Sequence, residues 1–316
     1  MNLLRLNFFI LTFFVFATYS EAQTEIVAPQ DSSGVIKRPS EILNLSEEKL
    51  IQTNALLADK TSRQLYMMQN SNFSSGQTDS VFDIDIGKND GNKTKRDDKK
   101  TPEGIYVLQQ KKTPPEIPFQ LYGTMAFTTN YPNVFDKFEN KTGSGIWLHS
   151  VPDNVALNRG SKGCVVLRND AIKKVEQHIS LNKTLMIINN QIHWLTSDEH
   201  DKKKTEAMTW LNTWKDLWEK QDLQAYIDNY SDQFSDPNYN KISWLKHKES
   251  LKEKYKYVKV NLSAPNIFSL KDQYLFQFVQ DYESDGHKDK GIKNLYVVQE
   301  KGKFKILREE WVAVND

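Results

Sequence analysis

The sequence predicts an α+β protein of two domains, a mostly-β domain followed by helices and a curved antiparallel sheet. From about residue 50, short apolar runs alternate with turn-forming segments, which is typical of strands. Near residue 200 the pattern changes to amphipathic helices and then returns to strands, which indicates a separate α+β unit. A length of 316 residues also suits about two domains, and a cut between them is expected to give two independently folded pieces.

The first 22 residues have the layout of a secretory signal peptide. Arg5 precedes an apolar run over residues 6–16, and small residues lead to a break after Ala22. The run is short for a membrane span, which favours a cleaved export signal over the alternative of an uncleaved N-terminal anchor. We therefore expect an exported protein.

An N-terminal arm or linker is predicted for residues 23–48. This stretch is polar and is interrupted by Pro29 and Pro39, so it offers little to a packed core. Such an arm could also join two copies of the chain into a homodimer.

Residues 49–198 predict the first domain, built mainly from strands. Two apolar runs around a turn-forming segment at 59–64 predict a hairpin, and residues 81–87 alternate with period two. The charged run 88–100 has nothing to bury and predicts a solvated loop. The remaining expected elements are strands at 104–110 and 144–150, a helix at 169–179 capped by Asn169 or Asp170, and a last hairpin turning at Asn189–Asn190.

Residues 203–316 predict the second domain. A first helix presents one apolar stripe, and a second amphipathic helix covers residues 242–255. Strands are expected at 257–270, 273–284 and 293–311. The stripe of the first helix consists of Met208, Leu211, Trp214, Leu217 and Trp218.

Aromatic residues are concentrated in the helical part of this second domain. Their flat faces would suit the rings of a glycan ligand. A spacing of four residues is also what a helix packed on a sheet requires, which favours a core over a pocket. The residues are Trp210, Trp214, Trp218, Tyr226 and Tyr230.

Composition narrows the possible partners. A formal net charge of +1 provides no basic field, so nucleic acid is not an expected partner. The histidines are scattered and Cys164 is the only cysteine, so we expect neither a metal site nor a cofactor. One cysteine cannot form an internal disulfide, which leaves Cys164 as either a buried apolar residue or a nucleophile.

His149 is the best partner for such a nucleophile. A free thiol has a pKa of about 8.5, and an adjacent imidazole can lower it and later protonate the leaving amine. His149 ends an apolar strand shortly before Cys164, which suits a loop that returns the cysteine to the same sheet edge. Gly160 and Gly163 permit a tight backbone there, and the amides of Gly163 and Cys164 could form an oxyanion hole.

Three motifs in this order resemble the L,D-transpeptidase (YkuD-type) family. "IWLHS" followed by "SKGCVVLRN" is similar to its His…Ser/Thr-X-Gly-Cys catalytic motif, and "KTPEGIYVL" (100–108) to its Thr-Pro-X-Gly strand. "NYPNVFD" (130–136) resembles an element of the bacterial murein-trimming branch. The likeness covers about residues 50–195. The second domain resembles a nuclear-transport-factor-2-like (NTF2-like) cone, a combination similar to the cell-shape-determining L,D-carboxypeptidases of helical and curved bacteria.

Three positions depart from the usual family pattern. Lys162 stands where most members have histidine, and Val166 where most have arginine, with Arg168 two places further on. Ser150 replaces the glycine that commonly follows the first histidine. These changes leave the His149–Cys164 pair intact but alter the surroundings in which the family recognises a substrate carboxylate.

The resemblance implies a periplasmic acyl transferase that acts on peptidoglycan stem peptides. Cys164 would be the nucleophile and His149 the base and acid, with the backbone carbonyl of Ser150 orienting the imidazole. Five further residues are candidates for contacts with the substrate or the oxyanion: Tyr131, Ser161, Lys162, Gly163 and Arg168.

The implied reaction has two possible outcomes. Cys164 would attack the meso-diaminopimelate carbonyl at the bond to terminal D-alanine and form a thioester. If water attacks this thioester, the protein is an L,D-carboxypeptidase. If an amine attacks it, the protein is an L,D-transpeptidase that forms 3-3 cross-links or exchanges D-amino acids. The altered neighbours of Cys164 favour hydrolysis. A third alternative is a murein- or glycan-binding protein whose catalytic domain is inactive.

Overall fold

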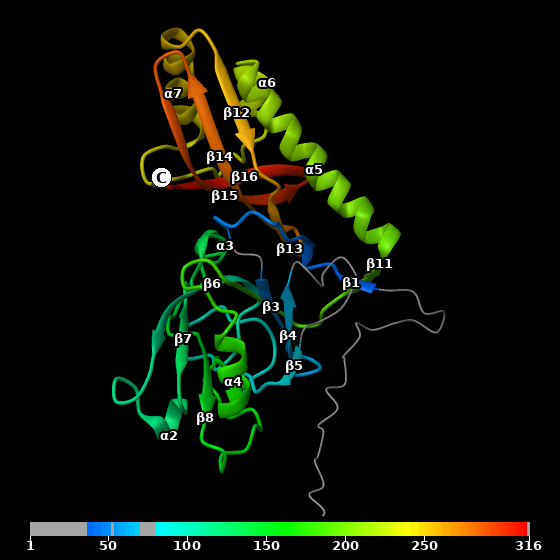
Figure 1. Cartoon of the computed structure of the whole chain (residues 1–316), viewed down its shortest axis with the longest axis vertical. Helices are drawn as coiled ribbons and strands as arrows, with labels where there is room; N and C mark the ends of the chain where they lie inside the picture. The colour runs from blue at the N-terminus through cyan, green and yellow to red at the C-terminus, as the bar shows by residue number, and fades with distance from the viewer. Residues whose placement is uncertain (1–36, 52–53, 70–79, 315–316) are drawn as a thin grey trace, which may run out of the picture.

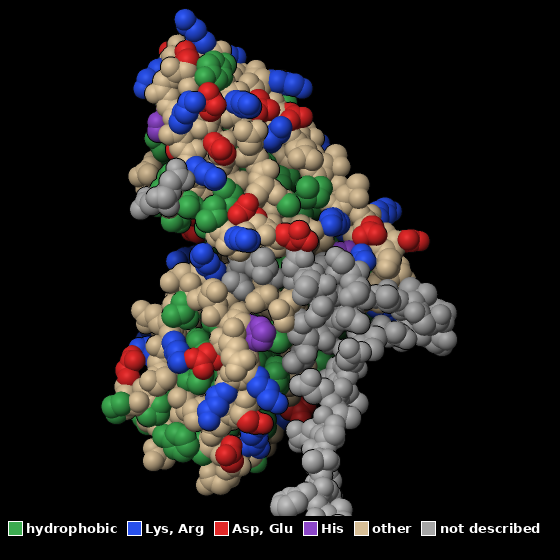
Figure 2. Space-filling model, in the orientation of Figure 1, with side chains coloured by type: hydrophobic (Ala, Val, Ile, Leu, Met, Phe, Trp, Pro, Cys, Tyr) green, Lys and Arg blue, Asp and Glu red, His purple; other side chains and the backbone are tan. Residues whose placement is uncertain are grey.

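The computed structural model describes residues 37–51, 54–69 and 80–314, which form two lobes (Figure 1). The predicted signal peptide 1–22 and residues 23–36 of the predicted arm lie outside the described residues. Charged side chains of both signs are interspersed over the visible face of each lobe (Figure 2), as the near-zero net charge implies. In the described part of the chain, no helix has both the length and the apolar character needed to cross a membrane.

The first lobe is built on an eight-stranded sheet in the order β5-β4-β3-β10-β6-β7-β8-β9. The predicted hairpin is confirmed, because β3 and β4 pair antiparallel. Three helices, α2 (Phe119–Tyr122), α3 (Val134–Phe138) and α4 (Asn169–Glu176), connect or flank the strands. The strands are β3 (Asn54–Asp59), β4 (Gln64–Gln69), β5 (Ser80–Asp83), β6 (Gly104–Lys112), β7 (Ala126–Thr129), β8 (Trp147–Val151), β9 (Val165–Arg168) and β10 (Leu185–Asn189).

Two local expectations in this lobe are wrong. No hairpin forms at Asn189–Asn190, because β10 pairs with β3 and β6 and β11 (Trp194–Thr196) pairs elsewhere. All five residues of β10 are buried, as its unbroken apolar run would require of a central strand. Helix α4 is capped at Arg168 rather than at Asn169 or Asp170, without a side-chain capping bond.

The second lobe packs helices against a strongly paired antiparallel sheet, as predicted. Helix α5 (Ser197–Glu219) runs along the outside of the lobe from the junction (Figure 1), followed by α6 (Leu223–Ile227) and α7 (Lys241–Lys254). The sheet order is β16-β15-β14-β13-β2, with β12 also paired to β14. The strands of this part are β12 (Val258–Leu262), β13 (Asn266–Leu270), β14 (Gln273–Ser284), β15 (Lys288–Glu300) and β16 (Lys303–Ala313).

The domain boundaries differ from those expected in two places. Helix α5 begins at Ser197, with a capping box between Thr196 and Glu199, so this helix starts before residue 203, where the second domain was expected to begin. Part of the predicted arm is structural: β1 (Lys37–Pro39) pairs with β11, and β2 (Ile42–Asn44) joins the second sheet beside β13. Ile42 and Leu43 are fully buried there. These two adjacent apolar residues were the feature of the sequence that indicated a strand in the arm.

Besides the apolar core of each lobe, a further apolar core joins the two lobes. It combines residues of the first sheet, such as Leu57 and Ile187, with residues of the second, such as Phe268 and Leu275. The rings of Phe135 and Tyr296 meet edge-to-face across the same boundary. Because the lobes share a core, they are expected to behave as one folding unit and not as two independent pieces.

The aromatic residues of the second lobe mainly form its core. Trp214, Tyr226 and Tyr230 are almost fully buried between α5, α6 and the sheet, as the spacing of four predicted. Trp218 packs in the same core and also lines a smaller cavity of about 370 Å³.

Candidate functional site

The two residues singled out for catalysis line one cavity at the edge of the first sheet. Strands β8 and β9 are parallel neighbours, with His149 in register with Val166, and Cys164 directly precedes β9. The loop between them therefore returns Cys164 to the strand that carries His149, as its sequence spacing predicted. The cavity has a volume of about 740 Å³, and both side chains contribute to its wall.

The imidazole of His149 is buried and oriented by the backbone. Its Nδ1 lies 2.7 Å from the carbonyl oxygen of Ser150, so Nδ1 carries the proton and donates it to that oxygen. Nε2 is then left with the lone pair that a general base needs. The ring of Tyr122 packs edge-on against the imidazole. Burial lowers the pKa of His149 below its ordinary value, against the opposing effects of the hydrogen bond to Ser150 and of the charge of Asp85, so the imidazole is neutral at pH 7.

The thiol of Cys164 is also neutral in the resting protein. It donates a hydrogen bond to the carbonyl oxygen of Gly145, with a sulfur–oxygen distance of 3.5 Å. Burial raises the pKa of this thiol to about 11, although the backbone of Trp147 and the charge of Lys93 oppose the rise. The expected lowering by the imidazole does not occur, because a neutral ring provides no positive charge to stabilise a thiolate.

The loop before Cys164 is held by its own polar groups. The Ser161 hydroxyl donates to the carbonyl oxygen of Cys164 (2.8 Å) and accepts from the amide of Gly163 (3.1 Å). Gly163 has a φ of +131°, and a Cβ there would lie 2.6 Å from the Lys100 carbonyl oxygen. Glycine is therefore required at position 163 by both conformation and space. Because the Gly163 amide is already bonded, the amide of Cys164 is the better oxyanion donor.

Three sequence candidates, Gly163, Arg168 and Tyr131, do not line the cavity. The Arg168 guanidinium donates to backbone carbonyls of the 153–155 segment and does not line the cavity. Tyr131 is buried, and its hydroxyl donates to the carbonyl oxygen of Thr142 (3.1 Å). Lys162, in contrast, is exposed and does line the cavity, together with Ser161.

Several residues of the cavity were missed from the sequence. Asp85, in the alternating strand pattern, is buried and accepts from the amide of Gly160 at 2.9 Å, which ties the cysteine loop to β9's edge. Lys93 and Arg96 line the cavity from the charged run 88–100. This run is a loop but is not simply solvated: Lys93 is buried and pairs with Asp98 (2.7 Å).

Asp98 organises this loop. Burial acts to raise its pKa, but the bond from Lys93 and several backbone amides outweigh burial and bring it to about 2. A carboxylate that stays ionised throughout the neutral range holds the loop closed. Within the described ranges, no group of three or more His, Cys, Asp or Glu side chains is placed to hold a metal ion.

Comparisons with known proteins identify both domains. The L,D-transpeptidase catalytic domain family (YkuD) matches residues 53–188, and the Cds6 C-terminal NTF2-like domain family matches residues 206–310. No curated protein matches the chain.

Solved structures resemble the whole two-domain arrangement. Bd1075 from Bdellovibrio bacteriovorus is 44% identical, with a TM-score of 0.82 over 88% of this chain and 99% of Bd1075. The helical cell shape determining protein Pgp2 from Campylobacter jejuni is 26% identical, with a TM-score of 0.65 over 87% of this chain and 94% of Pgp2. The chain therefore belongs to the family of proteins that join a YkuD L,D-transpeptidase catalytic domain to a C-terminal NTF2-like domain.

Proposed function

We propose that the protein is a periplasmic cysteine L,D-carboxypeptidase that removes terminal D-alanine from the tetrapeptide stems of peptidoglycan and thereby influences cell shape. The observation that carries the proposal is the shared cavity, in which an oriented neutral imidazole and a neutral thiol line one wall. The family's activity on peptidoglycan supports the substrate class, and the likeness to Pgp2 supports the role in cell shape.

The first half of the reaction forms a thioester. His149 Nε2 accepts the Cys164 proton as the sulfur attacks the meso-diaminopimelate carbonyl carbon, so a thiolate does not have to accumulate beforehand. The amide of Cys164 donates to the developing oxyanion. The C–N bond then breaks, and His149 returns the proton to the amine of the departing D-alanine.

The second half regenerates the thiol. A water molecule gives a proton to His149 and attacks the thioester, the C–S bond breaks, and the sulfur is reprotonated. The products are D-alanine and a tripeptide stem. Hydrolysis requires one stem and a path for water, whereas transpeptidation must also hold an acceptor amine in attack geometry. Lys162 and Val166, which replace the usual histidine and arginine, therefore favour hydrolysis.

The carboxylate of the substrate needs a cation, and Arg168 is not available to it. Among the described residues, the basic side chains that line the cavity are Lys93, Arg96 and Lys162. Lys93 is already bonded to Asp98, so Arg96 and Lys162 are the residues that we propose to meet a stem carboxylate. Changing either to Gln should raise KM more than it lowers kcat.

The test is incubation with purified disaccharide tetrapeptide followed by mass spectrometry. Wild-type protein should release D-alanine and accumulate tripeptide, and both His149→Ala and Cys164→Ala should abolish this release. A 3-3 cross-linked dimer or an exchanged D-amino acid as main product would show a transpeptidase. No turnover by a folded protein that binds the stem would favour the inactive murein-binding alternative.

A second, smaller cavity supports a glycan-binding role for the second domain. Trp218, Tyr282 and Trp311 line it. Aromatic faces suit the ring of a sugar. Sugars and muropeptides should raise the melting temperature of the wild-type protein, and this shift should shrink in Trp311→Ala.

A further inference from the structure

The segment between α3 and β8 forms a wall of the catalytic cavity and contacts Cys164. Gly143, Ser144 and Gly145 line the cavity, and the Gly145 carbonyl oxygen accepts the hydrogen bond of the Cys164 thiol. Gly143 and Gly145 have φ values of +102° and +73°. A glycine-rich backbone has only weak conformational preferences of its own, so neighbouring residues must fix the position of this segment.

A buried ion pair fixes the start of this wall. The Lys141 ammonium lies 2.9 Å from Asp136 Oδ1, and the two side chains are 5% and 2% exposed. The Lys141 backbone amide also donates to the Asp136 carbonyl oxygen at 2.9 Å. Burial opposes the charge of Lys141, but Asp136 outweighs it and keeps the pKa of the ammonium above its ordinary value.

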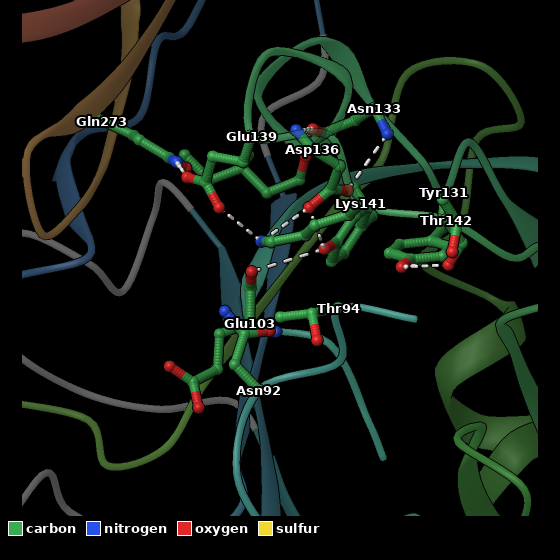
Figure 3. Close-up of polar contacts among 12 residues, drawn as sticks. Asn92, Thr94, Glu103, Tyr131, Asn133, Asp136, Glu139, Lys141, Thr142 and Gln273 are labelled. Carbon is green, nitrogen blue, oxygen red and sulfur yellow. Dashed lines mark hydrogen bonds and ion pairs between the residues drawn. The ribbon is translucent and has the colours of Figure 1, made fainter. Parts of the chain in front are cut away.

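The carboxylate of Asp136 is satisfied on several sides (Figure 3). It accepts from the backbone amide of Asn133 at 3.1 Å and from the hydroxyl of Tyr106 at 3.3 Å. Lys141 also reaches Glu139, which accepts from the side chain of Gln273 in the second domain (Figure 3). The pair is thus the centre of a network that connects α3, β6 and β14.

Thr142 fixes the next position by three bonds. Its carbonyl oxygen accepts from the Tyr131 hydroxyl (3.1 Å, Figure 3), its amide donates to the Thr94 carbonyl oxygen (3.0 Å), and its hydroxyl accepts from the Arg96 amide (3.1 Å). Thr94 and Arg96 belong to the loop that supplies the basic side chains of the cavity.

A buried ion pair is weak evidence for stability, because desolvation of the charges offsets their attraction. The placement of this pair, directly before a glycine-rich wall that contacts the nucleophile, indicates a different purpose. We propose that Lys141 and Thr142 are positioning residues, which set the Gly145 carbonyl against the Cys164 thiol in the resting state. The effect on turnover rests on the proposed function, whereas the effect on the thiol does not.

The test is the double variant Asp136→Asn/Lys141→Met, which removes both charges, keeps an acceptor oxygen for the Asn133 amide and places an NH2 group that can donate to the Tyr106 hydroxyl. Turnover of disaccharide tetrapeptide should fall about tenfold to a hundredfold, because a displacement on the order of 1 Å costs that much. The hydrogen bond to Gly145 stabilises only the neutral thiol, so its loss should make alkylation of Cys164 by iodoacetamide about threefold faster at a fixed pH. The single variant Lys141→Arg, which keeps a positively charged partner for Asp136, should have turnover and alkylation rates close to those of wild type. Lys111→Met, which removes the ion pair with Glu176 on the surface of the same domain, is the matched control.

The two readouts separate the possible outcomes. A folded double variant with wild-type turnover and alkylation would overturn the proposal, and so would slow turnover with unchanged alkylation. If the double variant does not fold, Tyr131→Phe removes only the hydroxyl bonded to Thr142 and should show the same two changes in smaller measure; the absence of both would also overturn it. If wild-type protein releases no D-alanine, the proposed function fails while the alkylation comparison still decides the positioning role.

Discussion

Alkylation of Cys164 should report a neutral thiol over the whole physiological pH range. Iodoacetamide reacts with the thiolate, so its rate follows the ionised fraction. The pKa of Cys164 is about 11, against about 8.5 for a free cysteine, so its ionised fraction at pH 7 is roughly 300-fold smaller. The alkylation rate should therefore be roughly 300-fold below that of a free thiol.

The assay measures the mass shift of the intact protein against time, from pH 6 to pH 11. The rate should rise by about tenfold per pH unit across most of this range, with no plateau before about pH 10. His149→Ala should leave the rate at pH 7 nearly unchanged, since a neutral imidazole does not stabilise a thiolate. An inflection near or below pH 8.5 that disappears in His149→Ala would refute this reasoning, because it would reveal a thiolate–imidazolium pair.

Three further predictions follow from the same structure. Because burial lowers the pKa of His149, and the base must be unprotonated, the acid limb of kcat should lie below pH 6.5; a limb above pH 7 in the pH–rate profile would contradict this. Gly163→Ala should lower stability by about 1–3 kcal/mol and reduce turnover, because the residue keeps a φ of +131° and its Cβ meets the Lys100 carbonyl. Gly160→Ala is the control: its added Cβ would lie 3.7 Å from the nearest atom, so its free energy of unfolding should be within about 0.5 kcal/mol of wild type. A fragment of residues 45–198 should be insoluble or bind hydrophobic dyes, because it exposes the core shared with Phe268 and Leu275; a fragment with wild-type melting behaviour would show that this interface contributes little.

The sequence predicted that His149 and Cys164 would lie at one cavity because the signal for both residues is local. A histidine at a strand end, a short loop and Gly-Cys are close in the chain, and β8 and β9 bring them together without a distant segment. The Ser150 carbonyl follows from the same strand, since it belongs to the residue next to His149.

Other parts of the site depend on contacts that no local pattern contains. Arg168 has the same charge whether it faces the cavity or the 153–155 carbonyls, and only the packing of the loop decides between them. Lys93 looked solvated in a charged run, yet Asp98 five positions later provides the partner that permits its burial. The raised pKa of Cys164 likewise results from burial of the thiol in the folded protein, which cannot be inferred from its neighbours in the sequence.

The strand β2 gives the chain an unusual order of assembly. It emerges before the catalytic domain, but its partner β13 belongs to the last part of the chain, and hydrogen bonds such as Ser46 to Asn266 join residues 220 positions apart. During synthesis from the N-terminus, β2 has no strand partner in its sheet until β13 has appeared. Strand pairings over such separations form late, because closing the long intervening chain costs conformational entropy before any contact is gained. The junction between the lobes is therefore completed only when the final sheet forms, so a chain truncated at its C-terminal end would leave its own beginning unpaired and open to association with other molecules.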